Sequence, residues 1–123
     1  MPGKHEVMRF IRSTFRSVWA LEMLCLLRKH ADRGWTEAEI VAALRASDLI
    51  VHQSLSALTA AGLVTVSGAG QVRYQPATPA LDTMVDAAER LYARSPDAVR
   101  RLIVASATGD LAAFADAFRF RRD

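Results

Sequence analysis

The sequence contains a single cysteine, Cys25, and this scarcity excludes two kinds of small protein. One thiol cannot form an intramolecular disulfide framework, and it supplies no cysteine pair for a structural zinc site. Its neighbours Leu24, Leu26 and Leu27 are apolar, which favours an inert core cysteine over a redox sensor. A reducing, cytoplasmic location is the simplest expectation.

Long apolar runs and a strong excess of one charge are also lacking. The densest apolar stretch, from Val18 to Leu27, is interrupted by Glu22, so it is too short to span a bilayer, and it starts too late to be a signal peptide. Lys and Arg number 16 against 13 Asp and Glu, which permits a nucleic-acid partner without requiring one. With 123 residues, 51% of them hydrophobic, one folded domain without membrane association is expected.

Residue patterns that support catalysis or metal binding are missing as well. His5, His30 and His52 have no second His or Cys at ligand spacing, so no metal site is expected. After Gly68-Ala69-Gly70, Arg73 stands where a dinucleotide fingerprint has its third glycine, and neither a G-x-S-x-G elbow nor a phosphate loop occurs. We therefore expect neither an enzyme nor a cofactor.

What the sequence does contain is a series of amphipathic helices. The stretch from Val7 to Ala31 lacks Gly and Pro and repeats apolar residues at helical spacing, which predicts one long N-terminal helix. From Val18 onward the apolar residues spread around most of its circumference, which indicates either a central core helix or a helix with one face in a dimer interface. Phe10, Trp19, Met23 and Leu26, which cannot share a face with Val18 and Leu21, favour the dimer.

Two short helices and a hairpin are predicted next. Thr36 and Glu39 form a capping box at the start of the first of these helices, and Ser47 is placed to cap the second. The second helix has an inward face of Val51, Leu55 and Leu58 and ends at Gly62. Residues 63–66 and 71–74 are β-type runs on either side of a glycine turn, which is typical of a hairpin.

The C-terminal part is predicted to be helical. Pro79 and Pro96 each stand at a first helical position, and Asp110 is placed to cap a last short helix. Asp82, Asp86 and Glu89 are interpreted as a solvated face. The chain then divides into residues 1–78, which include the long N-terminal helix, and a helical extension of residues 79–123 packed on the same domain.

The order of these elements resembles a winged helix-turn-helix domain of the MarR and ArsR kind. The resemblance depends on three stretches: Ile40-x-x-x-Leu44, Ser47-x-x-x-Val51-x-x-x-Leu55-x-x-Leu58 and Gly62-Leu63-Val64. They match the family's second helix, its recognition helix and the start of its wing, and cover about residues 34 to 76. The fold class implied is mainly α, with a two-stranded β wing and three additional C-terminal helices.

The resemblance implies a DNA-binding transcriptional regulator that binds double-stranded DNA as a homodimer. Gln53 is the residue best suited to reading a base edge, because its amide can both donate to and accept from adenine. Arg73 on the wing is the natural phosphate or minor-groove contact. The full set of predicted DNA contacts is Ser47, Leu49, Ile50, His52, Gln53, Ser56, Arg73 and Arg45.

One departure from the family pattern keeps a second function open. Between Arg45 and Arg73 there is no Lys or Arg, and Asp48 leaves this segment at −1 with His52 neutral, although phosphate neutralisation supplies most non-specific DNA affinity. Leu49 and Ile50 on a helix of little charge also suit a protein partner. The alternative is therefore a winged-helix adaptor that binds a protein through these residues and its C-terminal Phe/Arg tail.

Overall fold

The N-terminal segment forms two helices, α1 (Lys4–Thr14) and α2 (Val18–Lys29), in a computed structural model that describes residues 2–106. The single long helix predicted from Val7 to Ala31 is therefore wrong. Phe15 leaves the helical conformation at φ −101° and ψ 112°, and the Ser17 side chain caps α2 by accepting a backbone hydrogen bond at 3.3 Å. A serine cap starts a new helix without any Gly or Pro, so the absence of those residues was misleading.

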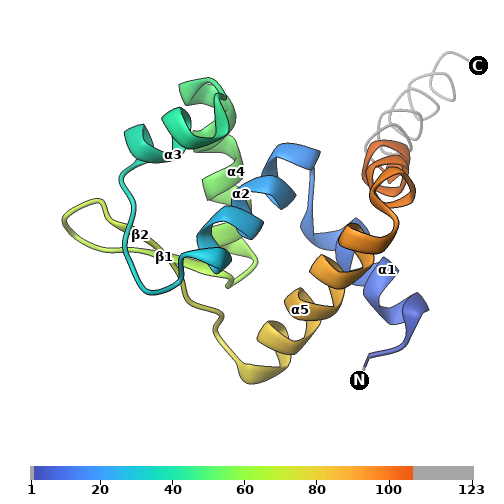
Figure 1. The fold of residues 1–123 in the computed structure, drawn as a ribbon. Coiled ribbons are helices and arrows are strands. Elements are labelled where there is room, and N and C mark those ends of the chain that lie inside the picture. Colours follow the sequence, from blue (N-terminus) through green and yellow to red (C-terminus); the bar gives the residue numbers. More distant parts are fainter. Residues whose placement is uncertain (1, 107–123) are drawn as a thin grey trace, which may run out of the picture.

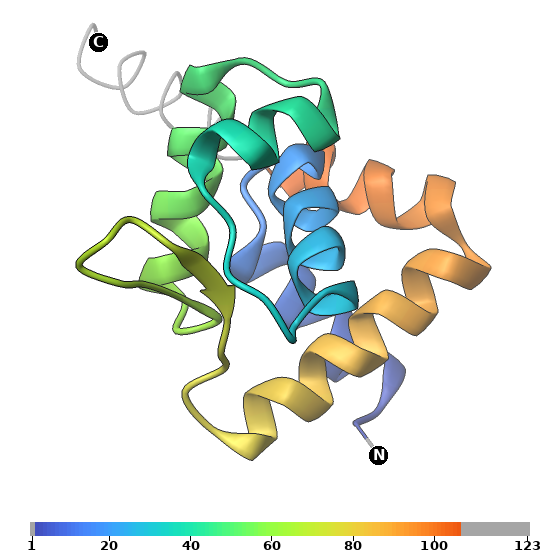
Figure 2. The ribbon, with the colours of Figure 1, turned by 60° about the vertical axis from the view of Figure 1, so that its left-hand side comes forward.

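Helix α2 lies at the centre of the molecule (Figures 1 and 2). It packs against α3 (Glu37–Leu44), α4 (Asp48–Ala60) and strand β2 (Val72–Tyr74). Its inward residues are fully buried: Ala20, Leu21, Met23, Leu24 and Leu27. The interpretation of this segment as a central core helix is confirmed.

Most of the apolar residues that suggested a dimer interface are covered within one chain. Met23 is fully buried, and Phe10 and Leu26 pack against the same core, because α1 and α2 approach it as separate helices. Trp19 remains 38% exposed. One chain thus covers most of the apolar residues that suggested a second interface, and the homodimer stays a prediction.

The predicted helix starts are confirmed by their caps. Thr36 and Glu39 form a reciprocal capping box, in which the Thr36 hydroxyl accepts from the Glu39 N–H at 3.1 Å and the Glu39 carboxylate accepts from the Thr36 N–H at 2.9 Å. These bonds hold the pKa of Glu39 below its usual range. Ser47 caps α4, and Thr78 caps α5 (Pro79–Arg94), with Pro79 at the predicted position.

Strand β1 (Val64–Val66) pairs with β2 in an antiparallel hairpin, with Val64 opposite Tyr74 and Val66 opposite Val72. Gly62 precedes it at φ +77°, a conformation that glycine adopts at little cost. The hairpin is tied to the chain before α3, because Trp35 and Val72 exchange two backbone hydrogen bonds of 2.7 and 2.6 Å. This bridge was not predicted.

The loop of the hairpin and the helix of residues 96–106 lie on opposite sides of the molecule, and α5 connects the two sides (Figures 1 and 2). Helix α5 packs on α1, and residues 96–106 continue as a further helix, whose Val99 and Ile103 are buried. The predicted fold of helices with a two-stranded antiparallel sheet is confirmed at this level. The last helix predicted at Asp110 lies outside the described residues.

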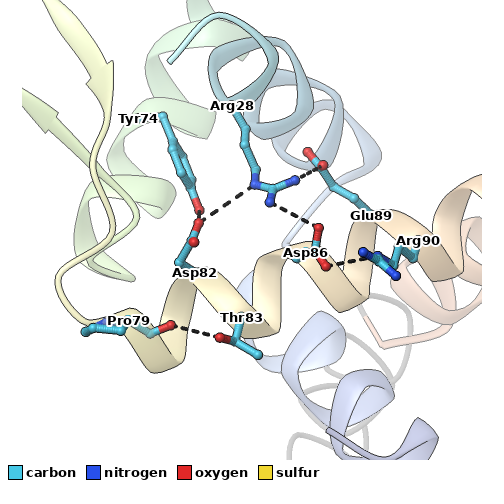
Figure 3. Close-up of polar contacts among 8 residues, drawn as sticks. All are labelled: Arg28, Tyr74, Pro79, Asp82, Thr83, Asp86, Glu89 and Arg90. Atoms are coloured by element: carbon cyan, nitrogen blue, oxygen red, sulfur yellow. Dashed lines mark hydrogen bonds and ion pairs between the residues drawn. The ribbon is translucent and has the colours of Figure 1, made fainter. Parts of the chain in front are cut away.

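Arg28 of α2 joins the central helix to α5 through three carboxylates (Figure 3). Its guanidinium donates to Glu89 at 2.5 Å and to Asp86 at 3.1 Å, and lies 3.8 Å from Asp82. The Tyr74 hydroxyl, on β2, donates to Asp82 at 2.6 Å. The interpretation of these acidic residues as a solvated face is therefore wrong, because each of them faces a partner on another element.

Replacement of a buried residue of α4 should lower the stability of the fold much more than replacement of a residue on its exposed face. Leu55→Ala leaves a cavity in the core and should lower the free energy of unfolding by roughly 2–5 kcal/mol. The control Gln53→Ala, on the exposed face, should change it by about 0.5 kcal/mol or less. Urea denaturation measures both, and a larger loss for Gln53→Ala would contradict the observed register of α4.

Removal of Arg28 should loosen α5. The Arg28 side chain is only 26% exposed, and Arg28→Met leaves three neighbouring carboxylates without their shared cation, so stability should fall by about 1–3 kcal/mol. Arg28→Lys should recover only part of it, because an ammonium cannot donate in the planar geometry of a guanidinium. The control Arg90→Ala removes only an exposed pair with Asp86 on the same helix, so a loss equal to that of Arg28→Met would contradict this assignment.

Candidate nucleic-acid interface

Helix α4 has one face in the core and the opposite face in solvent. Val51, Leu55 and Leu58 are buried, as the spacing predicted. Five of the predicted contact residues on this helix and its cap are exposed: Ser47, Leu49, His52, Gln53 and Ser56. The sixth, Ile50, is half-buried. These side chains therefore lie on the solvent-exposed side of a helix whose opposite side packs in the hydrophobic core.

Arg45 forms the turn between α3 and α4 in a left-handed conformation. Its φ is +54° and its ψ is 39°, and it is the only non-glycine residue with positive φ in residues 2–106. This conformation costs an L-residue with a β-carbon about 1 kcal/mol, and glycine is the usual choice. This conformation could not be predicted from the sequence, because arginine has no local preference for it. Its side chain is exposed at the start of α4.

Arg73 lies on β2, opposite Thr65, and its side chain is exposed. Its guanidinium donates to the backbone carbonyl of Ala31, just after α2, at 3.5 Å. The side chain thus leans toward the body of the molecule. Because the bond is long and exposed, it is weak, and the guanidinium can turn to a ligand at small cost.

A groove lies between the start of α2 and one side of α4, and its lining includes residues that were missing from the predicted set. Its volume is about 340 Å³. From the start of α2 it is lined by Arg16, Ser17, Trp19 and Ala20, and from α4 by Ile50, Gln53, Ser54 and Ala57. A long helix continuing through Ser17 could not predict this neighbourhood, because it depends on the turn at Phe15.

Negative charge also lies near the face of α4. The Nδ1 of His52 is 3.5 Å from a carboxylate oxygen of Glu37, at the start of α3. Arg33 is engaged elsewhere, because it pairs with Glu39 at 2.8 Å and stacks on the Trp35 ring at 3.9 Å. Arg45 precedes α4 in the chain, Arg73 lies on the hairpin that follows it, and Arg16 lines the groove beside it.

A second hollow, between α2 and α5, contains the one thiol. It has a volume of about 700 Å³, and Cys25, Arg28, Tyr74 and Glu89 are among its lining residues. Burial and the neighbouring Glu89 carboxylate raise the pKa of the Cys25 thiol to about 12. The thiol is thus protonated at neutral pH. Within residues 2–106, no group of three or more His, Cys, Asp or Glu side chains is arranged to hold a metal ion.

Comparison with known proteins identifies no relative, because no family model, curated protein or solved structure matches this chain. In the part that the structure describes, none of the helices combines the length and apolar character needed to cross a membrane.

Cys25 should behave as a shielded thiol. Because its pKa lies well above the ordinary value of 9.0, it should react with an aromatic disulfide reagent at least about tenfold more slowly in the folded chain than in urea. Equal rates would contradict the burial of this group.

The same shift predicts a pH effect of known sign. Between pH 9.0 and about 12 the unfolded chain releases the thiol proton while the folded chain keeps it, so this group lowers stability as pH rises. Denaturation of the parent and of Cys25→Ala from about pH 8 to about pH 11 measures the effect, and the parent should lose more stability than the variant over that interval.

Proposed function

We propose that this chain is a DNA-binding transcriptional regulator, in which α3 and α4 form a helix-turn-helix and the β1–β2 hairpin forms its wing. One observation carries the proposal: α4 is held by a buried apolar face while its outer face presents Gln53, His52 and serine hydroxyls to solvent. A supported helix with polar side chains of this size suits the DNA major groove.

The connections around α4 support the same assignment. Only residues 45–47 separate α3 from α4, which is the short link of a helix-turn-helix. The hairpin follows α4 directly and is fixed to the segment before α3 by the Trp35–Val72 bridge. Arg73 therefore belongs to a hairpin with a defined position relative to α4, as a wing that contacts the DNA backbone requires.

Binding as a homodimer belongs to this proposal. One copy of α4 carries no Lys or Arg, so a single module offers few phosphate contacts. Two-fold pairing doubles them and matches the symmetry of a palindromic operator. Cytoplasmic location and the absence of a catalytic role are part of the same proposal.

A protein-binding adaptor is the second candidate, because one observation favours it. Leu49 is 64% exposed on the outer face of α4, and Trp19 is exposed in the nearby groove. Exposed apolar side chains on a weakly charged surface are typical of protein interfaces. The tail that was predicted to contribute lies outside the described residues.

Two substitutions test the regulator by fluorescence anisotropy on DNA selected from genomic fragments. Arg73→Ala should weaken binding to all sequences and lower the magnitude of the salt slope by roughly one per subunit, because it removes one phosphate contact. Gln53→Ala should cost about 1–3 kcal/mol on the selected site and little on random DNA, because it removes base contacts. Arg94→Gln, which changes the same charge at the far end of α5, is the matched control for Arg73.

The adaptor predicts a different pattern. Leu49→Asp should then abolish binding to the partner protein, while Arg73→Ala and Gln53→Ala leave partner binding intact. If the parent chain shows no salt-dependent DNA binding, the regulator is rejected in favour of this second candidate.

A further inference from the structure

A groove between the N-terminal and C-terminal helices has no part in the proposed function. Helix α1 packs on α5, and both lie on the side of the molecule away from α3 (Figure 1). Two hollows open along α1, with volumes of about 480 and 130 Å³. Because Lys4 and Leu91 line both of them, the hollows adjoin and form a single groove, the α1–α5 groove.

The larger hollow is positively charged. Its lining includes three cationic side chains, Lys4 from α1 and Arg90 and Arg94 from α5, and no acidic side chain of the described residues. Arg90 pairs with Asp86 at 2.9 Å, whereas Lys4 and Arg94 have no ion-pair partner within residues 2–106. Two of the three cations are therefore available to an anion.

The smaller hollow is mostly apolar. Apart from Lys4 and Ser95, its lining residues are Met8, Leu91, Ala98, Val99 and Leu102. The larger hollow also has an apolar part, formed by Val7, Ala87, Leu91 and Ala93. The α1–α5 groove thus combines cations in its larger hollow with apolar side chains that extend into the smaller one.

We propose that the α1–α5 groove binds an aliphatic carboxylate, with the carboxylate at Lys4 and Arg94 and the hydrocarbon chain in the smaller hollow. Such a ligand offsets the charge of the two available cations, and its chain covers apolar side chains that line the groove. An organic cation would be repelled by the same lining, and an inorganic anion would leave the apolar side chains uncovered. This inference goes beyond the proposed function, because it requires no DNA binding.

Calorimetric titration of the chain with hexanoate, octanoate and decanoate, below the concentrations at which they form micelles, tests the proposal. Each added methylene should tighten binding about threefold until the smaller hollow is filled, because its burial removes apolar surface from water. Decyltrimethylammonium has a chain of similar length on a cationic head. It should bind at least about tenfold more weakly than decanoate, because the cations of the groove repel it.

Reversal of the charge at Lys4 tests the head-group contact. Lys4→Glu should weaken decanoate binding about five- to tenfold, because it replaces an attractive charge with a repulsive one at an exposed position. The variant is compatible with the fold, since a carboxylate in the first turn of a helix interacts favourably with the helix dipole. Arg9→Glu makes the same change in charge at an exposed position of α1 outside the groove lining, so it should leave binding within about twofold of the parent.

Replacement of Met8 tests the site of the hydrocarbon chain. Met8 is half-buried and lines the smaller hollow. Met8→Trp places a larger side chain there, so decanoate should bind this variant no more tightly than hexanoate does. The head-group contact at Lys4 is unchanged in this variant, and hexanoate should therefore bind it as it binds the parent.

The outcomes decide the proposal independently of the proposed function. Affinity that rises with chain length, prefers the anionic head and falls in Lys4→Glu supports it. It is overturned if decanoate does not bind, if affinity does not change with chain length, if decyltrimethylammonium binds as tightly, or if Lys4→Glu binds like Arg9→Glu. Thermal unfolding checks that each variant is folded, and Lys4→Gln replaces Lys4→Glu in the comparison if the latter is not. DNA titrations contain no aliphatic carboxylate, so failure of either proposal leaves the other standing.

Discussion

The burial of α2 is the constraint on which the rest of the structure depends. This helix is apolar around most of its circumference, and full burial of a single leucine such as Leu24 stabilises the fold by about 1.5–3 kcal/mol. Such a helix cannot remain at a surface, so other elements must cover it from several directions. Helices α3 and α4 and strand β2 cover one side, and α5 approaches another, where Arg28 adds a polar link. The solvent-exposed faces of these covering elements do not contribute to the core and are available to bind a partner.

In this arrangement, the residues that stabilise the fold differ from the residues of the candidate interface. The residues of α4 that support the core and those that face solvent are different sets, so the outer face can vary without loss of the fold. The polar cluster around Arg28 lies between α2 and α5, away from that face, and Arg28 and Arg90 together offset two of its three carboxylate charges. Its carboxylates therefore serve the position of α5. Burial and the hydrogen bond to Asp82 raise the pKa of the Tyr74 hydroxyl, which keeps it a donor to that carboxylate at neutral pH.

Local signals predicted those parts of the fold that depend on neighbours in sequence. The capping box at Thr36, the serine cap at Ser47, the glycine at position 62 and the inward face of α4 all act within one or two turns of chain, and each is observed. The predictions that failed concern features that depend on tertiary structure. Ser17 was hidden as a cap because its surroundings continue a helical pattern, and Arg28 could not be matched to carboxylates 58 and 61 positions away. The groove at Arg16 was missed for the same reason, since it exists only once the turn at Phe15 has been made.

The distribution of cations has a consequence for how DNA binding would work under the proposed function. A helix with its own Lys and Arg residues carries its phosphate contacts with it, whereas under the proposed function these contacts would come from other elements, Arg45 in the turn and Arg73 on β2. The affinity would then depend on the position of the hairpin relative to α4, which the core and the Trp35–Val72 bridge hold. Small displacements among packed elements misalign several contacts at once, so affinity is sensitive to changes in the core that leave every contacting residue in place.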